Sequence, residues 1–222
     1  MTKLIFDPQV IPVQSVTGEA AIVPEHLAAS WLRERFVHPP EWSPEASDEH
    51  LLRTKTGALT LASVLIPIVL REQGLTLMFT QRSEHLTDHG GQISFPGGRW
   101  EESDVSPIET ALRETEEEVG LARQHVEVLG TLPDYLTGTG YRVTPVVALV
   151  HPPFEIAADP KEVAEVFEVP LAYLMDGANH QLRAAEFPNG VHRTFYAMPY
   201  ERFFIWGATA GMLRNLFHFL RA

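Results

Sequence analysis

The sequence predicts an α/β sandwich, in which helices pack on a β-sheet. Three observations lead to this fold class: two apolar, β-branched runs at residues 60–69 and 75–81, an amphipathic segment at 106–120, and an apolar segment with helical spacing at 204–220. The chain has 222 residues, of which 45% are hydrophobic, so it can bury a sizeable core. This length fits one large domain, or one domain with an extension.

Charge and composition exclude several classes of function. The 29 acidic and 17 basic residues give a formal charge of −12, which disfavours binding to nucleic acid or to anionic membranes. Cysteine is absent, which excludes disulfides, thiolate nucleophiles and zinc sites built on cysteine and fits a reducing compartment. The N-terminus does not resemble a signal peptide, and the longest near-apolar run, residues 57–70, is short of the roughly 20 residues that span a bilayer. We therefore expect a soluble, cytoplasmic protein.

The first part of the chain, residues 1–57, is predicted to be a partly helical extension of a domain at 58–222. Val23–Phe36 is predicted to form one helix, with Pro24 near its start. Residues 38–50 are rich in proline and acidic residues, which is typical of a loop.

The remaining strands and helices follow in order. Thr60–Val69 and Leu75–Gln81 are predicted strands joined by a polar turn, and a long polar loop covers residues 82–91. Gln92–Phe95 is a short predicted strand, followed by a turn at Pro96-Gly97-Gly98. The later predicted strands are Val126–Leu132, Val143–Val150 and Val191–Ala197; Lys161–Phe167 is predicted as a short helix or turn, Val169–Met175 stays unassigned, and Phe204–Leu220 is a helix.

The segment at 106–120 has clear helix ends. Ser106 is a predicted N-cap, Pro107 stands at the first helical position, and Glu109 completes a capping box. Gly120 supplies a left-handed stop. The predicted core face holds five residues: Ile108, Ala111, Leu112, Thr115 and Val119.

Three glutamates on another face of this helix break local rules. Glu114, Glu117 and Glu118 are spaced i, i+3, i+4, so they repel one another, and two of them lie in the last turn, where the helix dipole disfavours anions. Glu118 lies only about 20° from Ala111 in projection, so it should sit at the edge of the core. A divalent cation would offset this repulsion, and oxygen-only ligands favour Mg²⁺ or Mn²⁺. Taken alone, the cluster favours an ordinary acidic surface helix over a metal site, because acidic runs are common.

The residues around the helix resemble the Nudix box of the Nudix hydrolases. The matching positions are Gly98, Asp104, Arg113-Glu114, Glu117-Glu118 and Gly120-Leu121. The sequence departs from the family pattern at three points: Asp104 stands where glutamate is usual, eight residues rather than seven separate it from Arg113, and Thr115 replaces an aliphatic residue. The extra residue precedes Pro107, so the helix keeps its register, and only the structural role of the first acid is in question.

A second signature lies upstream. The residues Phe79-Thr80-Gln81-Arg82-Ser83 and Gly91-Gln92-Ile93-Ser94-Phe95-Pro96-Gly97-Gly98 resemble the extra motif of the coenzyme A diphosphatase branch, which often shows the same aspartate and insertion. Residues 165–171 and 205–210 add to the resemblance, which covers about residues 61–220. Physically, paired glycines let the backbone approach a ligand closely, and Arg82 and Arg99 can hold phosphates. Without the Nudix box, the same residues would fit a tight turn and a surface arginine.

The resemblance implies a Nudix fold, an α/β/α sandwich around a mixed β-sheet, and metal-dependent hydrolysis of a phosphoanhydride. It assigns Mg²⁺ or Mn²⁺ to Glu114, Glu117 and Glu118, an orienting role to Arg113, and substrate contacts to Arg82, Gly97, Gly98 and Arg99. The proton acceptor is expected to be Glu117 or a later acid, among Glu162, Glu165 and Glu168, of which Glu165 ranks first. Asp104 and Gly120 would be structural.

The substrate implied by the branch is coenzyme A or an acyl form. Another nucleoside diphosphate derivative, such as ADP-ribose or NADH, is the alternative within enzymes, and a catalytically silent nucleotide-binding module is the alternative outside them. The aromatic residues between 195 and 206 fit core or the surface of a homodimer.

Overall fold

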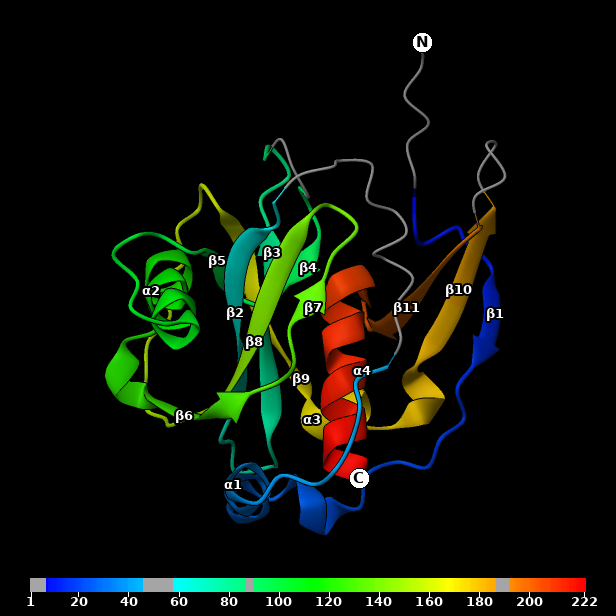
Figure 1. Ribbon diagram of the computed structural model, residues 1–222, viewed down its shortest axis with the longest axis horizontal. Helices are drawn as coiled ribbons and strands as arrows, with labels where there is room; N and C mark the ends of the chain where they lie inside the picture. Colours follow the sequence, from blue (N-terminus) through cyan, green and yellow to red (C-terminus); the bar gives the residue numbers. More distant parts are fainter. Residues whose placement is uncertain (1–6, 46–57, 87–89, 187–191) are drawn as a thin grey trace.

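The computed structural model describes residues 7–45, 58–86, 90–186 and 192–222, and it contains two β-sheets (Figure 1). The larger sheet has eight strands, with β4-β3-β2-β8-β6 in order, β5 paired to β2, β7 to β8 and β9 to β3. β2 and β8 are parallel and the other pairs are antiparallel, so the sheet is mixed, as expected. Its strands are β2 (Thr60–Val69), β3 (Thr76–Arg82), β4 (Ile93–Ser94), β5 (Gly97–Arg99), β6 (Val126–Thr131), β7 (Tyr135–Leu136), β8 (Tyr141–Val150) and β9 (Val163–Pro170).

Helices cover both faces of the larger sheet, which confirms the predicted α/β/α sandwich (Figure 1). Because successive side chains of a strand point to opposite faces, β2 contributes to two cores. Leu65 packs with Ala111 of α2 (Pro107–Val119) on one face. Ile66 lies in the larger core with Leu213 and other residues of α4 (Gly207–Arg221) on the other face.

The helix α2 has the predicted ends. The Ser106 hydroxyl accepts a hydrogen bond from the Glu109 N–H, and Gly120 adopts a left-handed conformation with φ of 70°. Thr115, which replaces an aliphatic residue of the family pattern, is 1% exposed and donates its hydroxyl proton to the Ala111 carbonyl. The substitution therefore buries no unsatisfied group.

A second, antiparallel sheet lies beyond α4, which packs between the two sheets (Figure 1). Its order is β1 (Val13–Val16), β10 (Gln181–Glu186), β11 (His192–Tyr200) and β12 (Phe203–Trp206). The sequence predicted only part of β11, whose expected first residue, Val191, lies outside the described residues. The C-terminal helix starts at Gly207 rather than at Phe204, because residues 203–206 pair with β11.

The structure corrects the prediction of a short helix or turn at 161–167. Most of this segment belongs to β9, which pairs with β3 along its length and places Phe167 opposite Phe79. The tertiary partner overrides the weak local pattern. The unassigned stretch 169–175 holds the end of β9 and the short helix α3 (Leu171–Leu174). The turn expected at Gly97-Gly98 is the strand β5, and the strand expected at 92–95 is reduced to Ile93–Ser94.

The N-terminal segment packs against β6 and against the end of α4. The single helix predicted from Val23 is divided into η1 (Pro24–Leu27) and α1 (Ala29–Val37), because Ala28 is extended. Arg33 of α1 donates two hydrogen bonds to Glu127 of β6, and Arg35 donates two to the Phe219 carbonyl at the end of α4. Of the loop expected at 38–50, residues 46–50 lie outside the described part. No helix in the described ranges is long and apolar enough to cross a membrane.

A buried ionic cluster fixes this segment to α4. Arg214 is 3% exposed and contacts Glu19 at 2.5 Å and Glu45 at 2.8 Å, with His180 and His218 also within hydrogen-bond distance. Burial opposes ionisation of Glu45, but the hydrogen bonds from His218, Arg214 and Tyr196 outweigh it and lower the pKa of Glu45 to about 2. Removing one member of such a cluster leaves its partners buried without compensation.

This cluster predicts an acid-sensitive contribution to stability. Because the folded pKa of Glu45 lies below its ordinary value of 4.5, its ionised form stabilises the fold above that pH. The contribution, on the order of 2 to 3 kcal/mol after screening, is lost as the pH falls from about 4.5 towards 2. Glu45→Gln should therefore be less stable than the wild type near neutral pH, with the two free energies of unfolding converging in acid.

Urea unfolding of both proteins between about pH 7 and pH 3 measures this difference. Carboxylates outside the Arg214 cluster titrate equally in the two proteins, so the difference isolates the cluster that Glu45 shares with Glu19. A constant difference across the range would contradict the prediction.

Candidate active site

Two glycines of β5 lie directly against the carboxylates of α2. A Cβ atom on Gly98 would lie 2.3 Å from Cδ of Glu114, so only glycine leaves space for this carboxylate. The Gly97 N–H donates a hydrogen bond to Oε2 of Glu118 at 3.0 Å. Gly97 has φ of +151°, and a Cβ atom there would lie 2.4 Å from the Ser63 carbonyl oxygen. The paired glycines thus let strand and helix approach closely.

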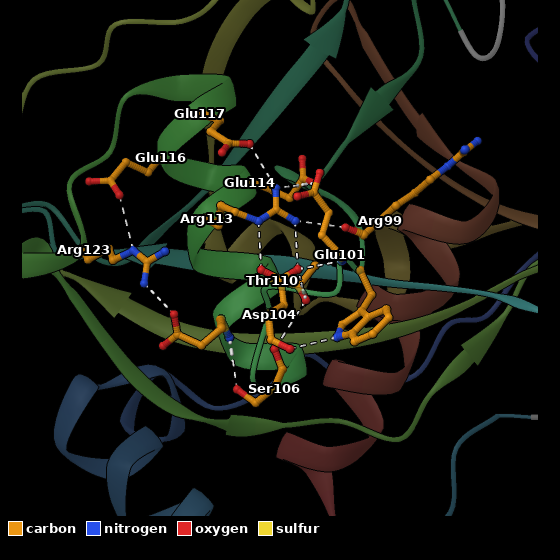
Figure 2. Close-up of polar contacts among 12 residues, drawn as sticks. Arg99, Glu101, Asp104, Ser106, Thr110, Arg113, Glu114, Glu116, Glu117 and Arg123 are labelled. Atoms are coloured by element: carbon orange, nitrogen blue, oxygen red, sulfur yellow. Dashed lines mark hydrogen bonds and ion pairs between the residues drawn. The ribbon is translucent and has the colours of Figure 1, made fainter.

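Arg113 is the centre of the polar network at the site (Figure 2). Its Nε and Nη2 bind the two carboxylate oxygens of Asp104, each at 2.9 Å. Its Nη1 donates to Glu114 and to Glu117, both at 3.0 Å, and Nη2 also donates to the Arg99 carbonyl at 3.1 Å. A planar guanidinium can serve all these acceptors at once, whereas a lysine ammonium cannot.

Asp104 has a complete set of partners despite its unusual spacing from Arg113. Besides the two bonds from Arg113, its carboxylate accepts the Glu101 N–H and the Thr110 hydroxyl. The hydrogen bonds from Arg113, more than those from Thr110 and Glu101, hold the pKa of Asp104 well below its usual range. Asp104 therefore forms a bidentate ion pair with Arg113 although it is shorter than glutamate and one extra residue separates it from Arg113.

The three glutamates of α2 differ in burial. Glu118 is 4% exposed, whereas the Glu117 side chain is 61% exposed. Burial raises the pKa of Glu118 to about 7, although Gly97 and Arg82 oppose the shift. Burial also raises the pKa of Glu114, with Glu117 and Glu162 adding to it and Arg113 opposing it. Desolvated carboxylates with neighbouring like charges are typical of functional sites.

Of the later acids, Glu162 is the one placed beside these carboxylates. It interacts electrostatically with both Glu114 and Glu118. The loop that carries it is tied to the end of α2, because the Asp159 N–H donates to the Glu118 carbonyl, and to β3, because the Ser83 N–H donates to the Glu162 carbonyl. The Ser83 hydroxyl donates to the carbonyl of Pro160, and Gly120 packs against Ala157.

Glu165, ranked first from the sequence, lies elsewhere. It occupies the same face of β9 as Phe167 and Val169, which belong to the core under α4, and it pairs with Arg202 at 2.5 Å. This is the face opposite α2. Glu168 pairs with Arg71 and Thr76. The alternation of side chains along β9 was not available to the sequence prediction, because that prediction did not recognise the strand.

The two arginines expected to bind substrate lie on different faces. Arg82 is directed towards α2, with Nη1 3.5 Å from Oε1 of Glu118, and its buried Nε has no hydrogen-bond partner within the described ranges. Arg99 directs its side chain away from the Arg113 network (Figure 2). It donates two hydrogen bonds to the Tyr141 hydroxyl. Tyr141 was not singled out individually from the sequence, although the glycine-rich segment at 137–142 precedes a predicted strand.

The donor set fits a hard divalent cation. Carboxylate oxygens are the preferred ligands of Mg²⁺ and Mn²⁺, and a cation would offset the burial of Glu114 and Glu118. In the described part of the chain, no three acidic or histidine side chains already surround one point. Arg113 donates hydrogen bonds to Glu114 and Glu117, while Glu118 accepts one from Gly97.

Comparisons with known proteins identify the family of this chain. The NUDIX domain model matches residues 59–188, more than half of the chain, and the chain belongs to the Nudix hydrolase family. Members are generally pyrophosphohydrolases acting on nucleoside diphosphate derivatives, and the family typically uses divalent metals. An Escherichia coli K12 relative, described as the uncharacterized Nudix hydrolase NudL, is 45% identical over 171 residues, which cover 75% of this chain and 88% of its own.

Solved structures with this fold include two bacterial proteins. The Nudix hydrolase RenU of M. smegmatis has a TM-score of 0.44 and 21% identity, over 52% of this chain and 73% of its own. A MutT/nudix family protein of Enterococcus faecalis has a TM-score of 0.44 and 14% identity, over 85% of this chain and 73% of its own.

The contact between Gly98 and Glu114 gives a direct test of the site. Gly98→Ala should displace the Glu114 carboxylate, because the added methyl group would overlap it. We expect turnover to fall about a hundredfold, the effect of misplacing a catalytic group by roughly 1 Å. Stability should fall little, because the backbone of Gly98 does not require glycine.

Gly207→Ala is the matched control. Gly207 has φ of +62° with open space around its Cα, so alanine there should cost about 1 to 2 kcal/mol of stability without affecting turnover. Equal turnover in Gly98→Ala and the wild type would contradict the role given to this glycine.

Proposed function

We propose that the chain is a coenzyme A diphosphatase, which hydrolyses the diphosphate of coenzyme A or acyl-coenzyme A. The products are 3′-phosphoadenosine 5′-phosphate and 4′-phosphopantetheine or its acyl form. One observation carries the proposal: the upstream segment that resembles the coenzyme A branch meets the carboxylates of α2. Arg82, near its start, lies 3.5 Å from Glu118, and Gly97, near its end, donates to the same side chain.

In this proposal the residues of α2 and Arg82 have different roles. Glu114, Glu117 and Glu118 hold Mg²⁺ or Mn²⁺, which when bound neutralises phosphate oxygens and makes an attacking water more acidic. Arg113 orients Glu114 and Glu117 through the bonds described above. Arg82 binds the diphosphate, because its guanidinium lies at the carboxylates.

The proton acceptor is a carboxylate near the attacking water. The sequence leaves Glu117 and the later acids Glu162, Glu165 and Glu168 as candidates, and Glu162 interacts with both buried glutamates. We rank Glu162 above Glu165, since Glu165 lies on the opposite face and is paired with Arg202. A general base must lie within hydrogen-bond reach of the proton that it removes.

Two alternatives remain distinct from this proposal. Hydrolysis of ADP-ribose or NADH would use the same metal site with a different substrate pocket. A catalytically silent nucleotide-binding module would not need the complete set of Arg113, Glu114, Glu117 and Glu118, and the intact set favours an enzyme.

The metal site is tested by titrating Mn²⁺ into the wild type and Glu117→Gln in a calorimeter. Loss of a ligand carboxylate should weaken binding at least about tenfold. Glu116→Gln is the matched control, because Glu116 lies on the same helix but pairs with Arg123 (Figure 2). If Glu117→Gln and Glu116→Gln bind Mn²⁺ equally well, the assignment of Glu117 is wrong.

The substrate is tested by product analysis. Mass spectrometry would follow the protein with Mg²⁺ or Mn²⁺ and, separately, coenzyme A, ADP-ribose, NADH and dinucleoside polyphosphates. We expect release of 3′-phosphoadenosine 5′-phosphate from coenzyme A at a rate well above the others. Replacing both Glu114 and Glu118 by glutamine should abolish turnover in a folded protein.

Preferred turnover of another substrate would keep the metal site and reject the coenzyme A assignment. Metal binding without turnover of any compound would instead favour the silent module.

A further inference from the structure

Arg99 is an exposed arginine with no carboxylate within ion-pair distance in the described ranges. Most described arginines of this chain, whose net charge is −12, have an acidic partner. Those with such a partner are Arg33, Arg71, Arg82, Arg113, Arg123, Arg142, Arg202, Arg214 and Arg221. Arg35 and Arg183 also have no carboxylate partner among the described residues, but they donate to backbone carbonyls.

The strand register directs Arg99 to the face of the sheet opposite α2. Gly98 is paired with Ser63 and faces Glu114, whereas Arg99 is paired with Ala62, which belongs to the core under α4. The backbone of Arg99 nevertheless remains part of the catalytic network, because its carbonyl accepts a hydrogen bond from Arg113. Arg99 therefore follows Gly98 in the chain, but its guanidinium lies on the other side of the strand from Glu114. Figure 2 shows the side chain directed away from the Arg113 network.

Tyr141 holds this guanidinium in a fixed orientation. Nε and Nη2 of Arg99 donate to the Tyr141 hydroxyl at 3.1 and 2.6 Å, and the guanidinium carbon lies 5.5 Å from the centre of the tyrosine ring. Tyr141 is fixed in turn, because its N–H donates to the Thr137 hydroxyl and its carbonyl accepts the Thr137 N–H. An arginine has five N–H donors, so three remain for a ligand.

A preoriented, uncompensated arginine with unused donors is suited to a phosphate group. The cleaved diphosphate already has Arg82 and the carboxylate site on the other face of the strand. A substrate with a second phosphate, separate from the diphosphate, is suited to use both arginines. Among the candidate substrates, coenzyme A has such a group on the 3′ carbon of its ribose, whereas ADP-ribose and NADH have none.

We propose that Arg99, positioned by Tyr141, binds the ribose 3′-phosphate and thereby selects 3′-phosphorylated nucleotides. This inference rests on the proposed function for the identity of the substrate. Arg99 is the group that touches the ligand, and Tyr141 is a positioning residue.

The first test is calorimetric binding of adenosine 3′,5′-bisphosphate and of AMP to the full chain with Mg²⁺. The wild type should bind the bisphosphate at least about tenfold more tightly, as expected for hydrogen bonds to a charged group. Arg99→Gln should bind both ligands as the wild type binds AMP, and Tyr141→Phe should be intermediate. The matched control is Arg142→Gln, because Arg142 follows Tyr141 but is paired with Asp134.

The second test compares kcat/KM for coenzyme A and 3′-dephospho-coenzyme A in the same variants. Arg99→Gln should lower the value for coenzyme A about tenfold or more and leave that for the dephosphorylated compound within about twofold. Equal loss on both substrates, or on neither, would overturn the assignment. So would a wild type that does not discriminate between them.

The two tests separate this inference from the proposed function. A wild type that cleaves both compounds without discrimination keeps the proposed function and rejects the 3′-phosphate subsite. A wild type that cleaves neither, but binds the bisphosphate through Arg99, rejects the proposed function and supports the subsite.

Discussion

The ion pair between Arg113 and Asp104 is the interaction on which the rest of the site depends. Arg113 makes hydrogen bonds to the loop that carries Asp104, to Glu114 and Glu117 of α2, and to the backbone of Arg99 in β5. Without this cation, three carboxylates would face one another in a partly desolvated site, which is strongly unfavourable. The pair therefore lets helix, loop and strand act as one rigid unit, and rigidity is what places oxygen ligands for a metal.

The sequence predicted those elements whose formation depends on residues close together in the chain. The ends of α2 were predictable because capping residues and a terminal glycine act within a few residues, and β2 because it is a long buried run. The second sheet could not be predicted, because β1 pairs with β10 across more than 160 residues and the four residues of β1 are exposed. β9 was misread for a related reason: its stability comes from pairing with β3 rather than from its own pattern.

The residues of the candidate site likewise divide into those that a local motif predicts and those that depend on strand pairing. The residues of α2 and the glycine pair were found because a motif fixes their spacing, and the structure brings Glu114 to Gly98 and Glu118 to Gly97. The choice among the later acids required the register of β9, since a shift of one residue moves a side chain to the other face of the sheet. That register directs Glu165 towards the α4 side, while Glu162, in the loop before β9, stays beside α2.

The face opposite α2 owes its shape to the parts of the chain that flank the segment matching the family. The match ends at residue 188, whereas β11, β12 and α4 follow it and β1 precedes it. These flanking elements pack as a layer beneath the larger sheet, locked by the contacts of Arg214 with Glu19 and Glu45. Within this layer Gly211 of α4 lies against the hydroxyl of Tyr135, whose strand β7 pairs with β8 next to Tyr141. Since Tyr141 orients Arg99, the flanking layer supports the surface on which the proposed second phosphate is bound. The face opposite α2 thus combines Arg99 and Tyr141, which lie within the segment that matches the family, with flanking elements that pack against it.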